Sequence, residues 1–208
     1  MNNIKTIVFD LYNTLIEIKK SNRFFLKLFE FSQDGFGMDT SLYLQLVMKN
    51  DVEELRNILP AEFSNLYDER LTELKEELDS ITVYTEVIGV LQNLKQDFRI
   101  FMISNLASPY KEPVFSKNLD QYFEKMIFSC DYGFLKPDKE IFKEVETITE
   151  NSPDEILMIG DSFKSDIIGA KNMGWRYLKI NRKTPISKDY EIKSLDEIKT
   201  HVTMCKRR

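Results

Sequence analysis

The pattern of apolar and polar positions first indicates a buried sheet. Short, mostly apolar runs recur along the chain and end on polar residues, and the first of them ends on Asp10. Near-continuous apolar runs of this kind are typical of parallel strands that are covered on both faces. The predicted strands lie at 4–9, 99–103, 125–128, 156–159 and 175–180.

Between these runs, apolar residues recur at the spacing of amphipathic helices. Asp138 is placed to begin one of these helices as its N-cap, and Gly174 is placed to end another. Strands that alternate with helices predict a parallel sheet with helices on both faces, which is an α/β fold. The predicted helices lie at 85–96, from about 109, from 139, up to 173 and at 195–203.

Residues 16–81 have a different pattern, in which Leu and Phe recur at helical spacing and glycine is scarce. We find no strand signal here, and we expect a four-helix module inserted after the first strand. The α/β core is then formed by residues 1–15 and 82–208, and the helical cap by residues 16–81. The predicted cap helices lie at 22–29, 40–48, 51–58 and 60–80.

Composition excludes several classes of function. The 208 residues carry a net charge of −5, which argues against a nucleic-acid partner. No apolar run approaches the roughly 18 residues that a membrane span needs, and Met1 leads almost directly into a strand rather than a signal peptide. His201 is the only histidine, so a histidine metal cluster is excluded. Cys130 and Cys205 read as reduced thiols of a cytoplasmic protein.

Four polar clusters follow predicted strands or lie in adjoining loops. Because parallel strands all end at one edge of a sheet, we expect these clusters to converge. Two carboxylates, a lysine and hydroxyl groups suit Mg²⁺ together with a phosphoryl group. The clusters are Asp10 with Thr14, Ser104 with Asn105, Lys136 with Pro137, and Asp161 with Asp166.

In their order and spacing these clusters match the four motifs of a known family. The chain resembles the haloacid dehalogenase-like hydrolase superfamily, whose members are mostly phosphatases. The resemblance covers roughly residues 4–15 and 83–181, and 16–81 matches the family's variable cap in position and size only. It implies a Rossmann-like core. The motifs are 10–15 (DLYNTL), Ser104-Asn105, Lys136-Pro137, and Gly160-Asp161-Ser162 with Asp166.

The resemblance also implies roles for individual residues. Asp10 would be the nucleophile, and Thr14, Ser104 and Lys136 would contact the transferred group. The neighbouring Asn105 is also expected to bind substrate. Mg²⁺ would be held by Asp10, the main-chain carbonyl of Tyr12 and Asp161, while Asp166 would support that site or Lys136.

Tyr12 departs from the pattern of the family's phosphatases, which usually carry a second Asp at this position as general acid and base. A phenol with a pKa near 10 is a poor base at neutral pH. Tyrosine here is typical of the family's metal-independent 2-haloacid dehalogenases, but an acid at position 161 fits a cation site better.

We therefore expect a Mg²⁺-dependent hydrolase, a monomer or homodimer, that acts on a small phosphorylated metabolite. The alternatives are a 2-haloacid dehalogenase and a weakly active or non-catalytic protein that binds a phosphorylated ligand.

Overall fold

The computed structural model describes the backbone of residues 4–204 and the side chains of residues 4–202. The predictions made for Cys205 lie outside these residues. Within the described part of the chain, no helix is both long enough and apolar enough to cross a membrane.

A six-stranded sheet forms the centre of the molecule, and each neighbouring pair of strands in it is parallel. The strand order is β5-β4-β1-β6-β7-β8. The five predicted strands are confirmed. β8 was not predicted, because its two residues form no apolar run. The strands are β1 (Thr6–Phe9), β4 (Arg99–Ser104), β5 (Lys125–Phe128), β6 (Ile156–Gly160), β7 (Arg176–Ile180) and β8 (Glu191–Ile192).

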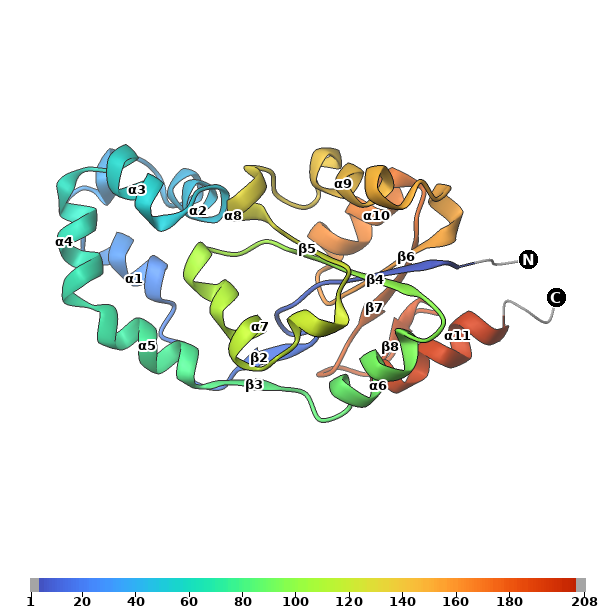
Figure 1. The fold of residues 1–208 in the computed structure, drawn as a ribbon. Helices are drawn as coiled ribbons and strands as arrows, with labels where there is room; N and C mark the ends of the chain where they lie inside the picture. Colours follow the sequence, from blue (N-terminus) through green and yellow to red (C-terminus); the bar gives the residue numbers. More distant parts are fainter. Residues whose placement is uncertain (1–3, 205–208) are drawn as a thin grey trace.

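Helices cover both faces of this sheet, and β1 shows why. Its successive side chains point to opposite faces. Ile7 and Phe9 belong to an apolar cluster with α6, α7 and α11, whereas Val8 belongs to a second cluster with α9 and α10. Figure 1 shows α9 and α10 above the sheet and α6 and α11 below it. The predicted α/β fold is confirmed. The bounds are α6 (Val87–Leu94), α7 (Glu112–Ser116), α8 (Ser129–Tyr132), α9 (Lys139–Thr149), α10 (Ile168–Met173) and α11 (Ile198–Met204).

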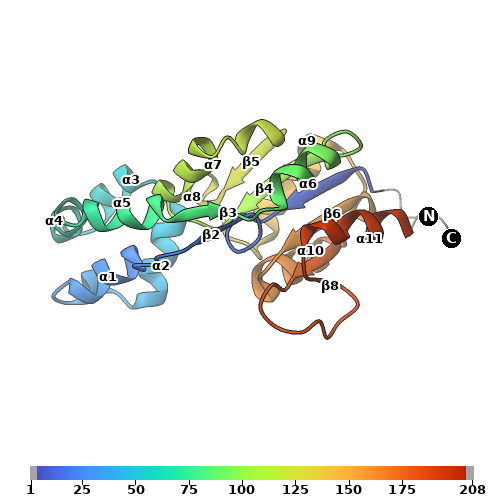
Figure 2. The same cartoon turned by 90° about the horizontal axis from the view of Figure 1, so that it is seen from below.

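Residues 24–79 form a separate group of helices beyond the carboxyl ends of the central strands, as Figures 1 and 2 show. Their apolar side chains make a third cluster, rich in aromatic rings, that includes Phe24, Tyr43 and Phe63. The helices are α1 (Phe24–Phe31), α2 (Thr40–Lys49), α3 (Val52–Ile58), α4 (Ala61–Glu69) and α5 (Leu71–Asp79).

Two predictions for this segment were wrong. The single helix expected over 60–80 is two helices that meet at Arg70, whose φ of −111° and ψ of 11° interrupt the helical path, so five helices stand where four were expected. The segment also contains a strand. β2 (Ile16–Ile18) pairs antiparallel with β3 (Ile81–Val83), and together they carry the chain out to the helices and back.

The helix predicted from about Pro109 also differs in detail. A 3-10 turn spans Ser108–Lys111, and only then does α7 begin. Asp138 does precede α9 as its N-cap, but its side chain makes no capping hydrogen bond. Gly174 ends α10 with a φ of 76°, as expected of a glycine C-cap.

Candidate active site

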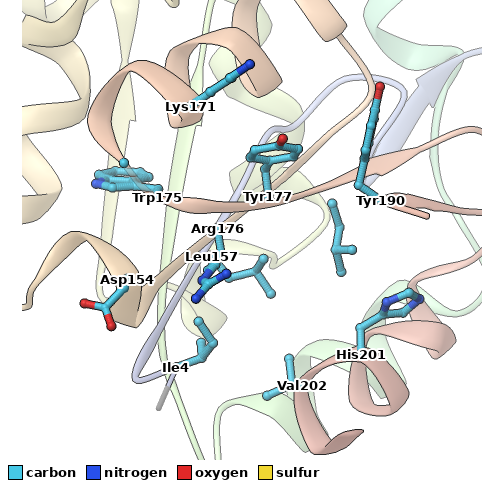
Figure 3. A pocket seen from close by; sticks show the side chains of 12 residues that line it. Ile4, Asp154, Leu157, Lys171, Trp175, Arg176, Tyr177, Tyr190, His201 and Val202 are labelled. Carbon is cyan, nitrogen blue, oxygen red and sulfur yellow. The ribbon is translucent and has the colours of Figure 1, made fainter. Parts of the chain in front are cut away.

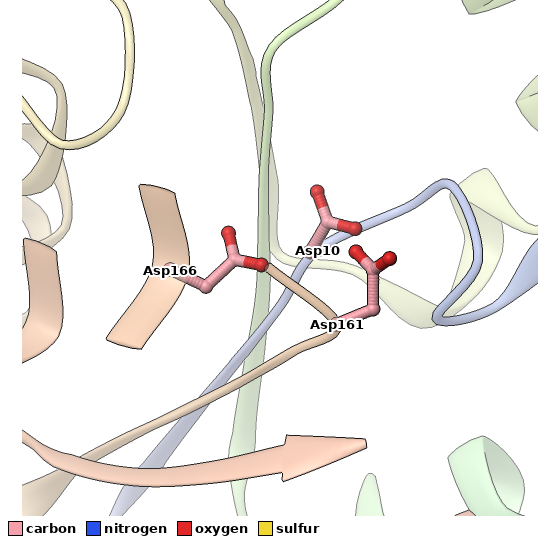
Figure 4. A group of neighbouring side chains, drawn as sticks. All are labelled: Asp10, Asp161 and Asp166. Atoms are coloured by element: carbon pink, nitrogen blue, oxygen red, sulfur yellow. The ribbon is translucent and has the colours of Figure 1, made fainter. Parts of the chain in front are cut away.

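Residues from three predicted motifs meet at the carboxyl edge of the sheet. Asp10 directly follows β1, Asp161 directly follows β6, and Lys136 reaches in from the loop after α8. β1 lies between β4 and β6, so the residues after these strands are neighbours. Figure 4 shows the side chains of Asp10, Asp161 and Asp166 directed toward one another.

A buried lysine joins two of these carboxylates. The Lys136 ammonium lies 2.7 Å from Asp10 Oδ1 and 2.6 Å from Asp166 Oδ1, and it also donates to the main-chain carbonyl of Ile103 at 2.7 Å. All three charged side chains are buried. Burial lowers the pKa of Lys136, but the two carboxylates outweigh this effect and raise it. Lys136 is therefore a permanent cation at the centre of the site.

The loop that carries Lys136 is fixed by Asn105. The Asn105 side-chain amide donates to the Lys136 carbonyl at 2.9 Å, and its oxygen accepts from the Lys136 backbone N–H at 2.8 Å. The peptide bond between Lys136 and Pro137 is cis. Ser104, the last residue of β4, is buried beside this contact. Asn105 thus orients the lysine, a role that the motif alone did not reveal.

Asp166 is positioned by an unusual turn and a close approach of the backbone. It lies in a π-helical turn at Phe163–Ile167, and its Oδ2 accepts from the Ser162 backbone N–H at 2.9 Å. A Cβ on Gly160 would come within 2.2 Å of the same Oδ2. Only glycine at position 160 therefore leaves room for this carboxylate.

The turn after β1 orients Asp10. The Thr14 hydroxyl donates to Asp10 Oδ2 at 3.1 Å, so each oxygen of Asp10 has a donor. Asn13 adopts the left-handed conformation with a φ of 60°, which asparagine tolerates better than most residues. Arg182 donates to the Thr14 carbonyl at 2.8 Å and so ties this turn to the segment after β7.

Three carboxylates give the site an excess of negative charge. Oxygens of Asp10, Asp161 and Asp166 lie within 4.8 Å of one another, with one ammonium among them. The pKa of Asp10 is raised to about 7 by burial, against the lowering effect of Lys136, and Asp166 raises it further. Burial and Asp166 also raise the pKa of Asp161. Hard oxygen donors with uncompensated charge suit a divalent cation such as Mg²⁺.

Tyr12 is directed away from these carboxylates. Its hydroxyl donates to the main-chain carbonyl of Tyr110 at 2.9 Å, and the two rings meet edge to face with centroids 6.0 Å apart. Burial raises the pKa of the Tyr12 phenol above its ordinary value. Its phenol is therefore protonated at neutral pH and cannot serve as a general base there.

A cavity of larger volume than any described beside Asp10 lies elsewhere, at the opposite edge of the sheet. It measures about 530 Å³ and is lined by Ile4 before β1, by Leu157 and Arg176 near the starts of β6 and β7, and by His201 on α11 (Figure 3). The carboxylates follow the other ends of these strands. This cavity therefore takes no part in the site around Asp10.

Comparison with known proteins identifies the family. The model of the haloacid dehalogenase-like hydrolases matches residues 4–174, which is most of the chain. The chain belongs to this family. The glyceraldehyde 3-phosphate phosphatase of Pyrococcus furiosus is 29% identical over 189 residues, covering 73% of this chain and 79% of that protein. The chain is therefore a hydrolase with phosphatases among its relatives.

Solved structures of this family share the fold. The hydrolase YfnB of Bacillus subtilis, solved with bound magnesium, has a TM-score of 0.67 at 21% identity, and the alignment covers 96% of this chain and 99% of that one. The L-2-haloacid dehalogenase of Xanthobacter autotrophicus has a TM-score of 0.68 at 18% identity, covering 96% and 98%. A hydrolase solved with magnesium and a haloacid dehalogenase thus share this fold, so the fold alone does not fix the chemistry of this chain.

Tyr110 and Arg182 shape the site but were not among the predicted residues, and Gly160 was named only as part of a motif. The main-chain carbonyl of Tyr110 accepts a hydrogen bond from the Tyr12 hydroxyl, and Arg182 donates one to the Thr14 carbonyl. Gly160 leaves space for the Asp166 carboxylate. Gly160 was detectable, because a glycine that ends a buried strand indicates a close backbone approach. Tyr110 and Arg182 lie 98 and 168 residues from their partners and carry no local signal.

Proposed function

We propose that the protein is a Mg²⁺-dependent phosphatase that hydrolyses small phosphate monoesters through an aspartyl-phosphate at Asp10. The observation that carries the proposal is the buried cluster of Asp10, Lys136 and Asp166 with Asp161 beside it. A nucleophilic carboxylate, a fixed cation and further acidic oxygens together fit the needs of phosphoryl transfer, which are positioning and charge stabilisation.

In the first step a carboxylate oxygen of Asp10 attacks phosphorus, and the bond from phosphorus to the ester oxygen breaks. The leaving oxygen takes the electron pair and gains a proton from water. Water then attacks the phosphorus of the aspartyl-phosphate and loses a proton to solvent. The bond from phosphorus to the Asp10 oxygen breaks, which releases phosphate and restores the Asp10 carboxylate. Lys136 orients the nucleophile, and its positive charge lies beside the phosphoryl group throughout.

The donor set also supports magnesium as the cofactor. Asp10 and Asp161, with the main-chain carbonyl of Tyr12, would hold Mg²⁺, and Asp166 would act through its ion pair with Lys136. When bound, the cation neutralises charge on the phosphoryl oxygens. A relative by fold, YfnB, was solved with magnesium, which agrees with this proposal.

A phosphatase assay tests the proposal. Release of phosphate from a panel of small esters should depend on Mg²⁺ and should vanish in Asp10→Asn, which retains the size of the side chain. No release above the Asp10→Asn control would contradict the proposal. Tyr12→Asp should raise the rate if the missing general acid limits turnover, since such help is worth about 10²–10⁴-fold.

Tyr12 favours the dehalogenase alternative. That activity would release halide from 2-chloropropionate without a metal, because carbon rather than phosphorus would be attacked. We expect no halide release, since Asp161 and Asp166 add negative charge where a carboxylate substrate would bind. Halide release that is insensitive to EDTA would overturn the phosphatase proposal.

We further propose that residues 16–81 act as the cap of this enzyme and that residues 1–15 and 82–208 form its core. The separate aromatic cluster of α1–α5 supports this division, as does the crossing of the chain through β2 and β3. A lid of this kind would exclude water from the reacting group.

A further inference from the structure

A second cavity, of about 290 Å³, opens between the helical segment and the core beside the proposed active site. Tyr12 and Asn105 belong to its wall. Tyr12 closely follows Asp10 in the sequence, and the Asn105 side chain holds Lys136 in place. The cavity therefore begins where the leaving group of a bound phosphate ester would emerge. Its other lining residues are Ile18, Arg23, Phe24, Phe25, Leu26, Leu44, Val47, Met48, Leu106, Ala107 and Tyr110.

The wall of this cavity is largely apolar. Aromatic side chains come from both sides, with Phe24 and Phe25 on α1 and Tyr110 in the core. The rings of Phe25 and Tyr110 lie 6.2 Å apart, so the two parts of the chain meet here. No carboxylate lines the cavity. A polar leaving group such as a triose would leave most of its hydroxyl groups without partners, which is costly.

Arg23 supplies the only charge in this wall. It adopts a left-handed conformation with φ of 52° and ψ of 49° directly before α1, a conformation that is uncommon for arginine. Among the side chains of residues 4–202, no carboxylate forms an ion pair with Arg23. Other arginines are neutralised, as the ion pairs of Arg56, Arg70, Arg99 and Arg182 show.

We propose that the substrate is a phosphate monoester whose leaving group carries an apolar ring with an acidic substituent. The ring would fill the cavity, and Arg23 would bind the acidic group at its rim. The inference rests on the proposed phosphatase function and names its substrate class. The cavity volume of about 290 Å³ lies just below the usual range for ligand sites, about 300–1,000 Å³, so one or two rings would fill it.

A series of esters with primary-alcohol leaving groups tests the substrate class. The series is ethyl phosphate, 2-phenylethyl phosphate, 2-(4-carboxyphenyl)ethyl phosphate and glycerol 3-phosphate. Burial of a ring should raise kcat/KM for 2-phenylethyl over ethyl phosphate by roughly 10- to 100-fold. The carboxylate of 2-(4-carboxyphenyl)ethyl phosphate should raise kcat/KM about tenfold further through a charged hydrogen bond to Arg23. Arg23→Gln should abolish this gain from the carboxylate and leave the gain from the ring.

Two tryptophan variants on α2 test whether the preference for a ring arises in this cavity. Leu44 lines the cavity, so Leu44→Trp should fill it and bring the ratio of 2-phenylethyl to ethyl phosphate close to one. Leu42 lies two residues earlier on the same helix, is 48% exposed and does not line the cavity, so Leu42→Trp should leave the ratio unchanged. Equal losses in both variants would overturn the proposal.

The inference and the proposed function fail in different ways. If ethyl and 2-phenylethyl phosphate are hydrolysed equally well, or glycerol 3-phosphate is preferred, the function stands and the inference is overturned. If no ester is hydrolysed, the proposed phosphatase function is wrong. The preference of the cavity for a ring can then still be tested by the binding of phosphonates. 2-Phenylethylphosphonate should then bind at least tenfold more tightly than ethylphosphonate by calorimetry, and equal dissociation constants would overturn it.

Discussion

The two walls of the active-site cleft are built on different principles. On the core side, charged groups surround Asp10, and the Asn105 side chain holds the Lys136 backbone in place through two hydrogen bonds, while Tyr110 lines the cavity. The wall from the helical segment consists of packed rings such as Phe24 and Phe25. Charged groups tolerate little displacement, whereas apolar packing accepts exchanges of similar volume. On the proposed function, exchanges in the helical segment would alter which substrate fits, while the charged groups of the core stay in place.

The largest effect should follow removal of the buried cation. Lys136→Met strands the carboxylates of Asp10 and Asp166 without a counter-charge, so we expect a loss of about 3–5 kcal/mol in the free energy of unfolding and no phosphatase activity. Urea denaturation measures the loss. The deficit should shrink at lower pH, because loss of Lys136 leaves the pKa of the buried Asp10 carboxyl even higher than in the wild type, and protonation neutralises this stranded group. Lys139→Met at an exposed position is the control, and equal stability of the two variants would contradict the expectation.

A smaller loss should follow crowding of Asp166. Gly160→Ala brings a Cβ to 2.2 Å from Asp166 Oδ2, so the carboxylate must move. We expect a loss of about 1–3 kcal/mol in stability and weaker binding of Mg²⁺ by calorimetry. Gly89→Ala meets no atom within 4 Å in α6 and should stabilise the protein by up to about 1 kcal/mol. Unchanged Mg²⁺ affinity in Gly160→Ala would refute this role for the glycine.

The helical segment should respond differently from the core. Phe63 is fully buried and packs against Phe36 and Tyr67, with both ring centroids 5.9 Å away. Phe63→Leu should cost about 1–2 kcal/mol, less than the 3–5 kcal/mol of truncation to alanine. Turnover of ethyl phosphate per folded molecule should stay near wild type. The exposed Phe115→Leu serves as control. A loss of turnover as complete as in Lys136→Met would erase the distinction between the two walls.

The smallest effect concerns Cys130, which lies where α8 packs against α2. Burial, aided by Asp131 and opposed by Lys111, raises the pKa of its thiol to about 12. The thiolate is the reactive form, so iodoacetamide should hardly label Cys130 at pH 8 in a Cys205→Ser background. Mass spectrometry of the peptide measures the label. Rapid labelling of the folded protein would mean that the contact between α8 and α2 opens freely.

The sheet and its motifs were predictable because the relevant signals are local. The run before Asp10 is apolar and short, and the same holds for the runs before Ser104 and Asp161. The break at Arg70 was not predictable, since neither Pro nor Gly marks it and the helical spacing of apolar residues continues through it. β2 was missed because a strand of three residues leaves too little pattern.

The charged residues of the candidate site were predictable, but its contacts and the residues Tyr110 and Arg182 were not. The motifs name Asn105 and Tyr12, but only the fold brings Asn105 onto the Lys136 backbone and the Tyr12 hydroxyl onto Tyr110. Such contacts join residues far apart in the chain, and their geometry depends on how loops close after the strands. The spacing of residues in the sequence does not determine the path of these loops.

The most direct test of the central claim is to trap the covalent bond at Asp10. Protein that is turning over a phosphate ester with Mg²⁺ is quenched with borohydride, which reduces an acyl phosphate to an alcohol. We expect the peptide containing Asp10 to carry homoserine at that position after this quench. Protein treated without ester should carry only aspartate there. Steady phosphate release with unmodified Asp10 after the quench would contradict the claim.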